Sequence, residues 1–223
     1  MIYSENILVC IAFPLLIALI FVGKRNRRFL LSFVIGMICC LLSAYITGYV
    51  QFVSETEPEK MSAFFSPIFE ELMKIMPLLF YMFVFTPKAS SLFSVALGVG
   101  LGFATFENCC YILSFGASNL SYAMIRALAV GIMHLVCALT LVFGLTNARH
   151  FRVLSLPAVI GSVSLSMVFH GLYNLLVSRP GLTSVFGYVM PIITAIVLYI
   201  PFRAVKRQET ERENIEGNPN EIK

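Results

Sequence analysis

The chain has 223 residues, of which 58% are hydrophobic and 13% are charged, and its mean hydropathy is +0.85. These values exclude an ordinary water-soluble domain and are typical of a polytopic membrane protein. With this apolar composition, we expect the lipid bilayer as the partner of the chain. The formal net charge of +4 is small, so we expect no nucleic-acid partner.

Apolar segments of about 20 residues, the length that crosses a bilayer core, follow one another along the chain. They predict an all-α bundle of about seven transmembrane helices. The predicted spans cover residues 6–22, 29–51, 62–85, 90–115, 122–146, 155–177 and 182–202. Residues 1–202 would form the bundle, with the polar motifs inside 62–177, whereas the charged tail 203–223 would be solvated and poorly ordered.

The basic residues are distributed unevenly between the two ends of the predicted bundle. Twelve lysines and arginines fall in the loops after spans one, three and five or in the tail, whereas the opposite end has only Lys60 and Arg179. By the positive-inside rule, this bias predicts an outside N-terminus and a cytoplasmic C-terminus. Because basic residues follow the first segment and do not precede it, we interpret that segment as a retained anchor.

Two further features have packing as their simplest explanation. All six cysteines fall inside predicted spans, where thiols act as small apolar side chains. The stretch GVGLG contains Gly98, Gly100 and Gly102 and resembles a phosphate loop, but no predicted strand precedes it. Glycines at this spacing in an apolar helix predict close approach of a neighbouring helix.

Few ionisable residues remain inside the predicted spans, where a charge at the bilayer centre costs roughly 2.5–3.5 kcal/mol. Such residues normally face the bundle interior and act in pairs or in sites. A rise of about 1.5 Å per residue puts Glu70, Glu71, Glu107 and His170 roughly 10–12 Å below the outer face, with Arg126 near the start of its span and His134 two turns deeper. All of them fall in one layer in the outer half of the membrane. Four successive spans contribute Glu70, Glu71 and Lys74, then Glu107 with Asn108, then Arg126 and His134, and finally His170 and Asn174.

The three charged residues of span three have a structural explanation beside a functional one. Glu70, Glu71 and Lys74 could form an ion pair that stabilises the bundle. A buried pair is often no more stabilising than apolar residues of the same volume, so a functional site is the stronger hypothesis. His134 and His170, taken singly, would be ordinary core histidines, but their common level with paired carboxylates favours a site.

The remaining polar residues leave two alternatives open. Glu107 and Arg126 either neutralise one another or orient the adjacent glutamates as an outer layer of the site. Tyr111 follows Glu107 by one helical turn, so its hydroxyl either bonds into the polar group or lies at the membrane interface.

Peptide hydrolysis by an activated water fits this set of residues. A carboxylate shielded from bulk solvent can act as a general base toward water. Imidazole and amide groups can position that water or stabilise the tetrahedral oxyanion. We therefore predict a glutamate of the 70–71 pair as the base, His134 as its partner, and His170 and Asn174 as donors.

Four motifs in chain order resemble the PrsW family of intramembrane proteases, which is related to the CAAX-processing protease superfamily. They are EELMK at 70–74, GFATFENCCY at 102–111, Arg126 with His134, and HGLYN at 170–174. The resemblance implies a multi-pass protease of the bacterial plasma membrane. Its substrate would be a single-span membrane protein, such as an anti-sigma factor, cut near the extracytoplasmic side.

The resemblance also implies catalytic roles for Glu70, His134, His170 and Asn174. It leaves open which of Glu70, Glu71 and Glu107 is the base. If the enzyme used a zinc ion, the ligands would be Glu70, His134 and His170. An HExxH motif is missing and only two histidines lie within the spans, so we expect a metal-free glutamate mechanism.

Other classes of membrane protein fit the sequence less well. An aspartyl intramembrane protease is excluded because the chain contains no aspartate, and no GxSx motif lies inside a predicted span to support a serine type. The main alternative is a proton-coupled or ion-coupled transporter, which would also bury Glu, Arg and His. No internal repeat is visible, and the polar residues lie toward one leaflet, so the protease is the better prediction.

Overall fold

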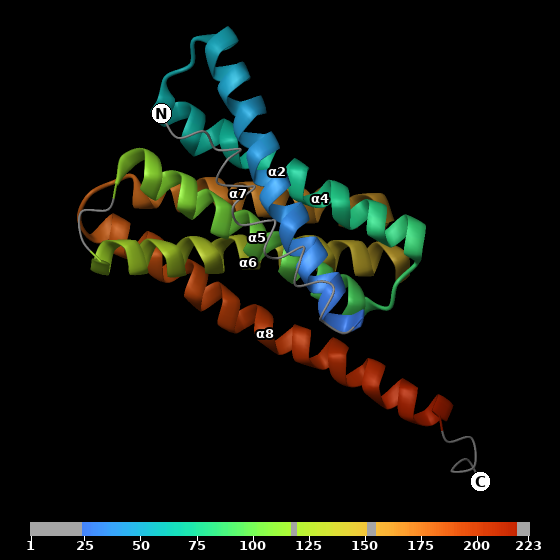
Figure 1. The fold of residues 1–223 in the computed structure, drawn as a ribbon. Helices are drawn as coiled ribbons and strands as arrows, with labels where there is room; N and C mark the ends of the chain where they lie inside the picture. Colours follow the sequence, from blue (N-terminus) through green and yellow to red (C-terminus); the bar gives the residue numbers. More distant parts are fainter. Residues whose placement is uncertain (1–23, 117–119, 151–154, 218–223) are drawn as a thin grey trace.

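The computed structural model describes residues 24–116, 120–150 and 155–217, and every element in these ranges is helical (Figure 1). The predicted all-α class is therefore confirmed for the described part of the chain. The elements are α2 (Lys24–Ser54), α3 (Pro58–Lys60), the π-helix η1 (Met61–Phe65), α4 (Ser66–Phe85), α5 (Ala89–Phe115), α6 (Leu120–His150), α7 (Ser155–Val177) and α8 (Leu182–Gly217).

Five of the described helices, α2 and α5 to α8, are long and apolar enough to cross a membrane, which makes the chain a multi-pass membrane protein. The predicted span 62–85 corresponds mostly to α4, which falls outside this set because it carries three charged residues. The predicted span 6–22 lies outside the described residues. The count of seven spans is therefore not confirmed, and the sidedness of the bundle stays a prediction.

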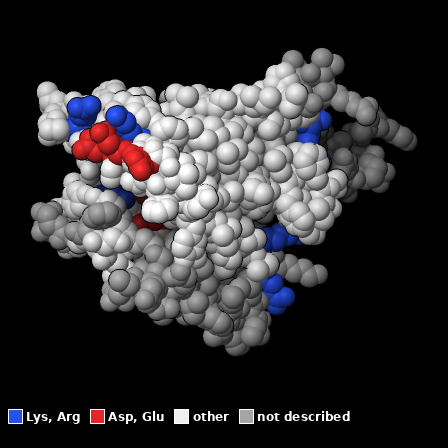
Figure 2. Space-filling model, turned by 90° about the horizontal axis from the view of Figure 1, so that it is seen from above, with Lys and Arg blue, Asp and Glu red and all other residues white. Residues whose placement is uncertain are grey.

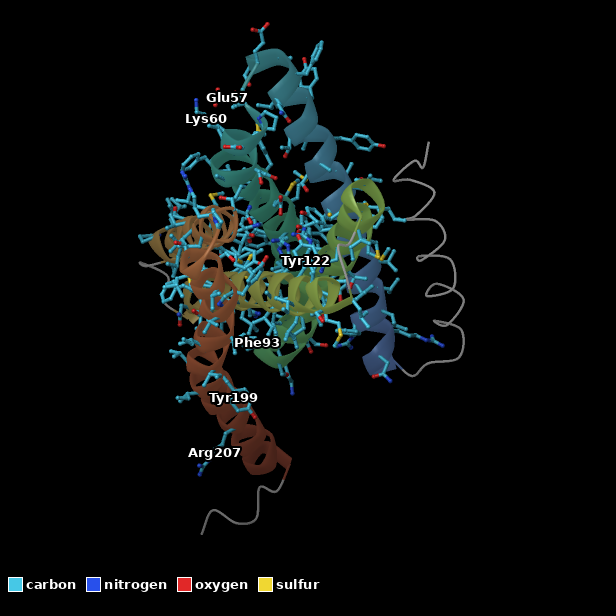
Figure 3. The ribbon with its side chains drawn as sticks, turned by 90° about the vertical axis from the view of Figure 1, so that its left-hand side faces the viewer. Glu57, Lys60, Phe93, Tyr122, Tyr199 and Arg207 are labelled. Carbon is cyan, nitrogen blue, oxygen red and sulfur yellow. The ribbon has the colours of Figure 1, made fainter. Side chains whose placement is uncertain are left out.

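The polar connections lie at opposite ends of the molecule. Figure 3 places Glu57 and Lys60 at one end and Arg207 at the other, with Phe93 and Tyr122 between them. Figure 2 shows few charged side chains on the face it draws, and a broad uncharged surface separates them. This separation is what a bundle needs if its middle is to lie in hydrocarbon and its ends in water.

Helices α2 and α5 approach one another so closely that their backbones touch. A Cβ atom added to Gly36 would lie 2.1 Å from the carbonyl oxygen of Val99, and one added to Gly102 would lie 1.9 Å from that of Phe33. Only glycine fits at either position. The predicted packing role of the GVGLG stretch is therefore confirmed.

The apolar core lies mainly between α4, α5 and α6. Leu78, Ala96, Val99, Leu141 and Leu145 in this core have no exposed surface. The five described cysteines are free thiols, as expected for packing residues, and Cys10 lies outside the described residues. In Figure 1, α2 crosses the bundle obliquely and α8 extends beyond it.

The C-terminal segment differs from the sequence-based expectation. Helix α8 continues beyond residue 202 to Gly217, whereas the sequence predicted a poorly ordered tail from Arg203. Glu, Arg and Lys are good helix formers, and a helix that already exists grows without a second nucleation step. The functional division of the chain into bundle and tail stays a prediction.

Candidate active site

Polar side chains from four helices meet inside the bundle, and we call this group the polar cluster. Its members are Glu70, Glu71 and Lys74 of α4, Glu107 of α5, Arg126 and His134 of α6, and His170 of α7. Each of them was a candidate site residue on sequence grounds. The structure joins all of them through a continuous series of hydrogen bonds and short contacts.

Glu71 accepts two hydrogen bonds at one carboxylate oxygen, whereas its other oxygen, Oε2, is buried without a hydrogen-bond partner among the described residues. Its Oε1 accepts hydrogen bonds from Lys74 Nζ at 2.6 Å and from His170 Nδ1 at 2.9 Å. The side chains of Glu71 and Lys74 are both completely buried. An ionised carboxylate can only accept hydrogen bonds, so His170 carries its proton on Nδ1 when neutral and presents a lone pair at Nε2.

His134 is held from both sides of its ring. Its Nε2 lies 2.5 Å from Glu107 Oε2, and its Nδ1 lies 2.6 Å from Lys74 Nζ. Because an ammonium group can only donate, Nδ1 accepts and the ring proton sits on Nε2, which donates to Glu107. The ring also packs against Phe103 and, in a T-shaped arrangement, against His170, each at a centroid distance of 5.0 Å. The orientation of His134 is therefore fixed.

Arg126 closes the far end of the polar cluster. Its Nη2 lies 3.3 Å from Glu107 Oε1, so the two residues neutralise one another, which was the first of the two alternatives. Glu107 reaches the α4 carboxylates only through His134 and Lys74 in the described contacts. The guanidinium stacks on Tyr111 at 3.4 Å from the ring centroid. Tyr111 thus contacts the polar cluster through a cation–π interaction, and its hydroxyl lies 3.2 Å from that of Tyr122.

Glu70 has a different environment from its neighbour Glu71. Its Oε1 accepts a hydrogen bond from Ser66 at 2.6 Å. Its Oε2 is buried, has no hydrogen-bond partner among the described residues, and lies 3.6 Å from His170 Nε2. The Glu70 side chain is 12% exposed and that of Glu71 is 0% exposed. Adjacent residues on a helix point about 100° apart, which separates the two environments.

The sequence also predicted two asparagines as site residues. Neither makes a described hydrogen bond to a member of the polar cluster. Asn174 Nδ2 donates to the carbonyl of Ser62 in η1 at 3.0 Å. Asn108 is buried, and its Oδ1 has no partner among the described residues. Asn174 therefore ties α7 to the π-helix, and its amide would have to leave Ser62 before it could bind a substrate.

Sequence reasoning missed three residues that touch the polar cluster. Ser66 precedes Glu70 by four residues, a helical spacing that would have indicated the contact. Cys137 follows His134 by three residues on α6, yet it was interpreted only as a packing residue. Phe103 lies 4.4 Å from Lys74 Nζ across two helices, and no sequence spacing indicates a contact of that kind.

The polar cluster contains donor atoms that could hold a metal ion. One ligand atom each from Glu70, His134 and His170 lie within 4.8 Å of one another, and so do those of Glu71, Cys137 and His170. Two imidazoles and a carboxylate form a typical catalytic zinc set, and the unpartnered Oε2 of Glu70 suits a ligand. The residues fit a metal on one condition, which is that His134 gives up one of its two hydrogen bonds.

A polar cluster buried in an apolar helix bundle defines a membrane-embedded enzyme or carrier. A family model described as "PrsW family intramembrane metalloprotease" matches residues 24–202, a range that contains the whole polar cluster. The chain therefore belongs to the PrsW family of intramembrane proteases, and the predicted resemblance is confirmed. This assignment favours the protease over the transporter. No curated protein and no solved structure gives a significant match.

Proposed function

We propose that the protein is an endopeptidase that uses a glutamate-activated water to cleave a single-span membrane protein near the extracytoplasmic side. An anti-sigma factor is a substrate of the expected type, and the bacterial plasma membrane is the expected location. The observation that carries the proposal is the buried Oε2 of Glu70, which has no described hydrogen-bond partner and lies 3.6 Å from His170 Nε2.

The charge balance of the polar cluster supports Glu70 as the base. Three carboxylates face two permanent cations, because the neutral tautomers assigned to both histidines add no charge. Lys74 is bonded to Glu71 and Arg126 to Glu107, which leaves Glu70 as the carboxylate without a cationic partner. A carboxylate in this position can take a proton without breaking an ion pair, as a general base must.

In the proposed reaction, water bound between Glu70 Oε2 and His170 Nε2 loses a proton to Glu70 as its oxygen attacks the peptide carbonyl. The proton then passes from Glu70 to the leaving amine, so the carboxylate is restored at the end of the cycle. The lone pair at His170 Nε2 suits it to accept a hydrogen bond from the water, and this replaces the oxyanion role expected from sequence.

The other residues of the site act mainly through positioning. Glu71 holds His170 in the required tautomer, as outer carboxylates commonly do. His134 has both ring nitrogens engaged and so links Lys74 to Glu107. Asn174 remains the proposed oxyanion donor, and its bond to the Ser62 carbonyl must open first.

The description of the family names a metalloprotease, and a metal ion would be held here by Glu70, His134 and His170. When bound, such an ion would polarise the peptide carbonyl and the attacking water. We propose the metal-free route because the Lys74 ammonium already occupies Nδ1 of His134. Glu70 keeps its position beside His170 in either case.

A comparison of membrane proteomes tests this function. Cells that carry Glu70→Gln should accumulate the uncut form of at least one single-span membrane protein, whereas Glu59→Gln, which removes an exposed glutamate, should not. Purified wild-type protein should then cut that accumulated substrate, and the Glu70→Gln variant should be at least roughly a hundredfold slower. Cleavage by the variant at the wild-type rate would reject the assigned base.

A further inference from the structure

A second site candidate lies outside the polar cluster, in a groove between α2, α4 and α5. Its volume is about 690 Å³, within the usual range for small-molecule sites. Apolar side chains line most of it, among them Leu31, Ile35, Pro77, Phe80 and Phe85. Phe80 follows Glu70 by ten residues on α4, which is about 15 Å along the helix axis. The groove is therefore separate from the proposed catalytic site.

One end of this groove is polar and positively charged. Arg28, Lys88 and Ser91 line that end, and Arg28 Nη1 donates to Ser91 Oγ at 3.4 Å. Lys88 is the N-cap residue of α5, whose 27 residues direct the positive end of the helix dipole to the same place. Arg149 lies beside it and donates to the carbonyl of Pro87, which also lines the groove.

The same groove is open on its apolar side. Phe80 is 62% exposed and Phe85 is 60% exposed, although both line it. Exposed phenylalanines on a transmembrane bundle contact acyl chains. The groove thus has a cationic end where α2 and α5 begin and α4 ends. From there an apolar surface continues along the helices. These are the two chemical requirements of a bound lipid.

We propose that this groove binds a phospholipid with an anionic head group. The phosphate would lie between Arg28 and Lys88, and an acyl chain would lie along Phe80 and Phe85. Basic pockets between helices at a membrane surface attract anionic head groups, whereas zwitterionic lipids gain much less there. The sequence-predicted sidedness would put this site in the cytoplasmic leaflet, opposite the proposed cleavage site.

The absence of tryptophan from the chain allows a clean test. Phe80→Trp puts a single fluorophore in the groove, and Phe186→Trp puts one at a similarly exposed position on α8. Each variant is reconstituted into phosphatidylcholine vesicles that contain either brominated phosphatidylglycerol or brominated phosphatidylcholine. We expect the anionic quencher to act on the Phe80→Trp reporter at roughly tenfold lower concentration than the zwitterionic one, and the Phe186→Trp reporter to make no such distinction.

Charge variants then test the cationic end. Arg28→Gln with Lys88→Gln, in the Phe80→Trp background, should abolish the preference for the anionic lipid. Arg27→Gln removes an adjacent charge outside the groove lining and should keep it. The proposal fails if both lipids quench equally or if the preference survives the double change. It also fails if neither lipid quenches the reporter, because another part of the protein, such as residues 6–22, would then cover the groove.

Discussion

Replacement of Lys74 by methionine would remove the cation that joins α4 to α6 in the proposed active site. The ammonium lies 2.6 Å from both Glu71 Oε1 and His134 Nδ1, and the Lys74 side chain has no exposed surface. Methionine is similar in length, so the change leaves little empty volume. What it does leave is a buried carboxylate with no cationic partner.

The expected cost follows from that unpaired charge. Breaking a buried ion pair on one side typically destabilises a protein by about 3–5 kcal/mol. A neutral hydrogen bond between membrane helices contributes only about 0.6 kcal/mol on average. These two energies differ enough for a stability measurement to show whether water reaches the Lys74–Glu71 ion pair.

We expect Lys74→Met to lower the free energy of unfolding by about 3 kcal/mol or more. Unfolding in detergent can be followed by far-UV circular dichroism, which needs no tryptophan. The double variant Lys74→Met with Glu71→Gln should be more stable than Lys74→Met alone, because residue 71 then carries no charge that has lost its partner. Lys60→Met, which breaks an exposed pair with Glu57, should leave stability unchanged.

A loss below about 1 kcal/mol for Lys74→Met would refute this reasoning. It would mean that water reaches Glu71 and solvates its charge. The double variant tests this explanation. If Glu71 is hydrated, adding Glu71→Gln to Lys74→Met should change the free energy of unfolding very little.

Two other predictions concern the metal and the helix packing. Prolonged treatment with a zinc chelator should leave cleavage of the accumulated substrate unchanged; loss of activity that Zn²⁺ restores would instead favour a metal held by Glu70, His134 and His170. Gly102→Val should lower the yield of folded protein and its melting temperature, because its Cβ would lie 1.9 Å from the Phe33 carbonyl, whereas Gly48→Val, with nothing within 4 Å, should change both much less. Equal melting temperatures for the two glycine variants would contradict the close contact of α2 and α5.

Several features of this protein could be predicted from its sequence because they depend on local spacing. Apolar length predicted the long helices, and helical rise predicted that Glu70, Glu107, His134 and His170 would lie at a common level. The structure brings these four residues together. The structure continues α8 through residues 203–217, where the sequence predicted no helix, because Glu, Arg and Lys have a high helix propensity.

Partner choice inside the polar cluster could not be predicted in this way. The sequence favoured the 70–71 pair, and the family resemblance favoured Glu70, but which of Glu70, Glu71 and Glu107 is the base stayed open. The Glu71–Lys74 pair lies within one helix, but only the packed bundle pairs Glu71 with His170 and Glu107 with His134 and Arg126, while Glu70 has no lysine or arginine partner among the described contacts. Asn174 illustrates the same limit, because its amide turns to the Ser62 carbonyl in η1.

The amino-acid sequence alone thus determined which polar groups lie within the apolar segments and how they are spaced along each helix, since the rise per residue is fixed. The rotation of each helix about its axis was decided only by tertiary contacts, such as the touching backbones at Gly36 and Gly102. A rotation of about 100° exchanges the environments of two adjacent residues. Packing between helices, and not spacing along them, therefore decides which neighbours from other helices each glutamate meets.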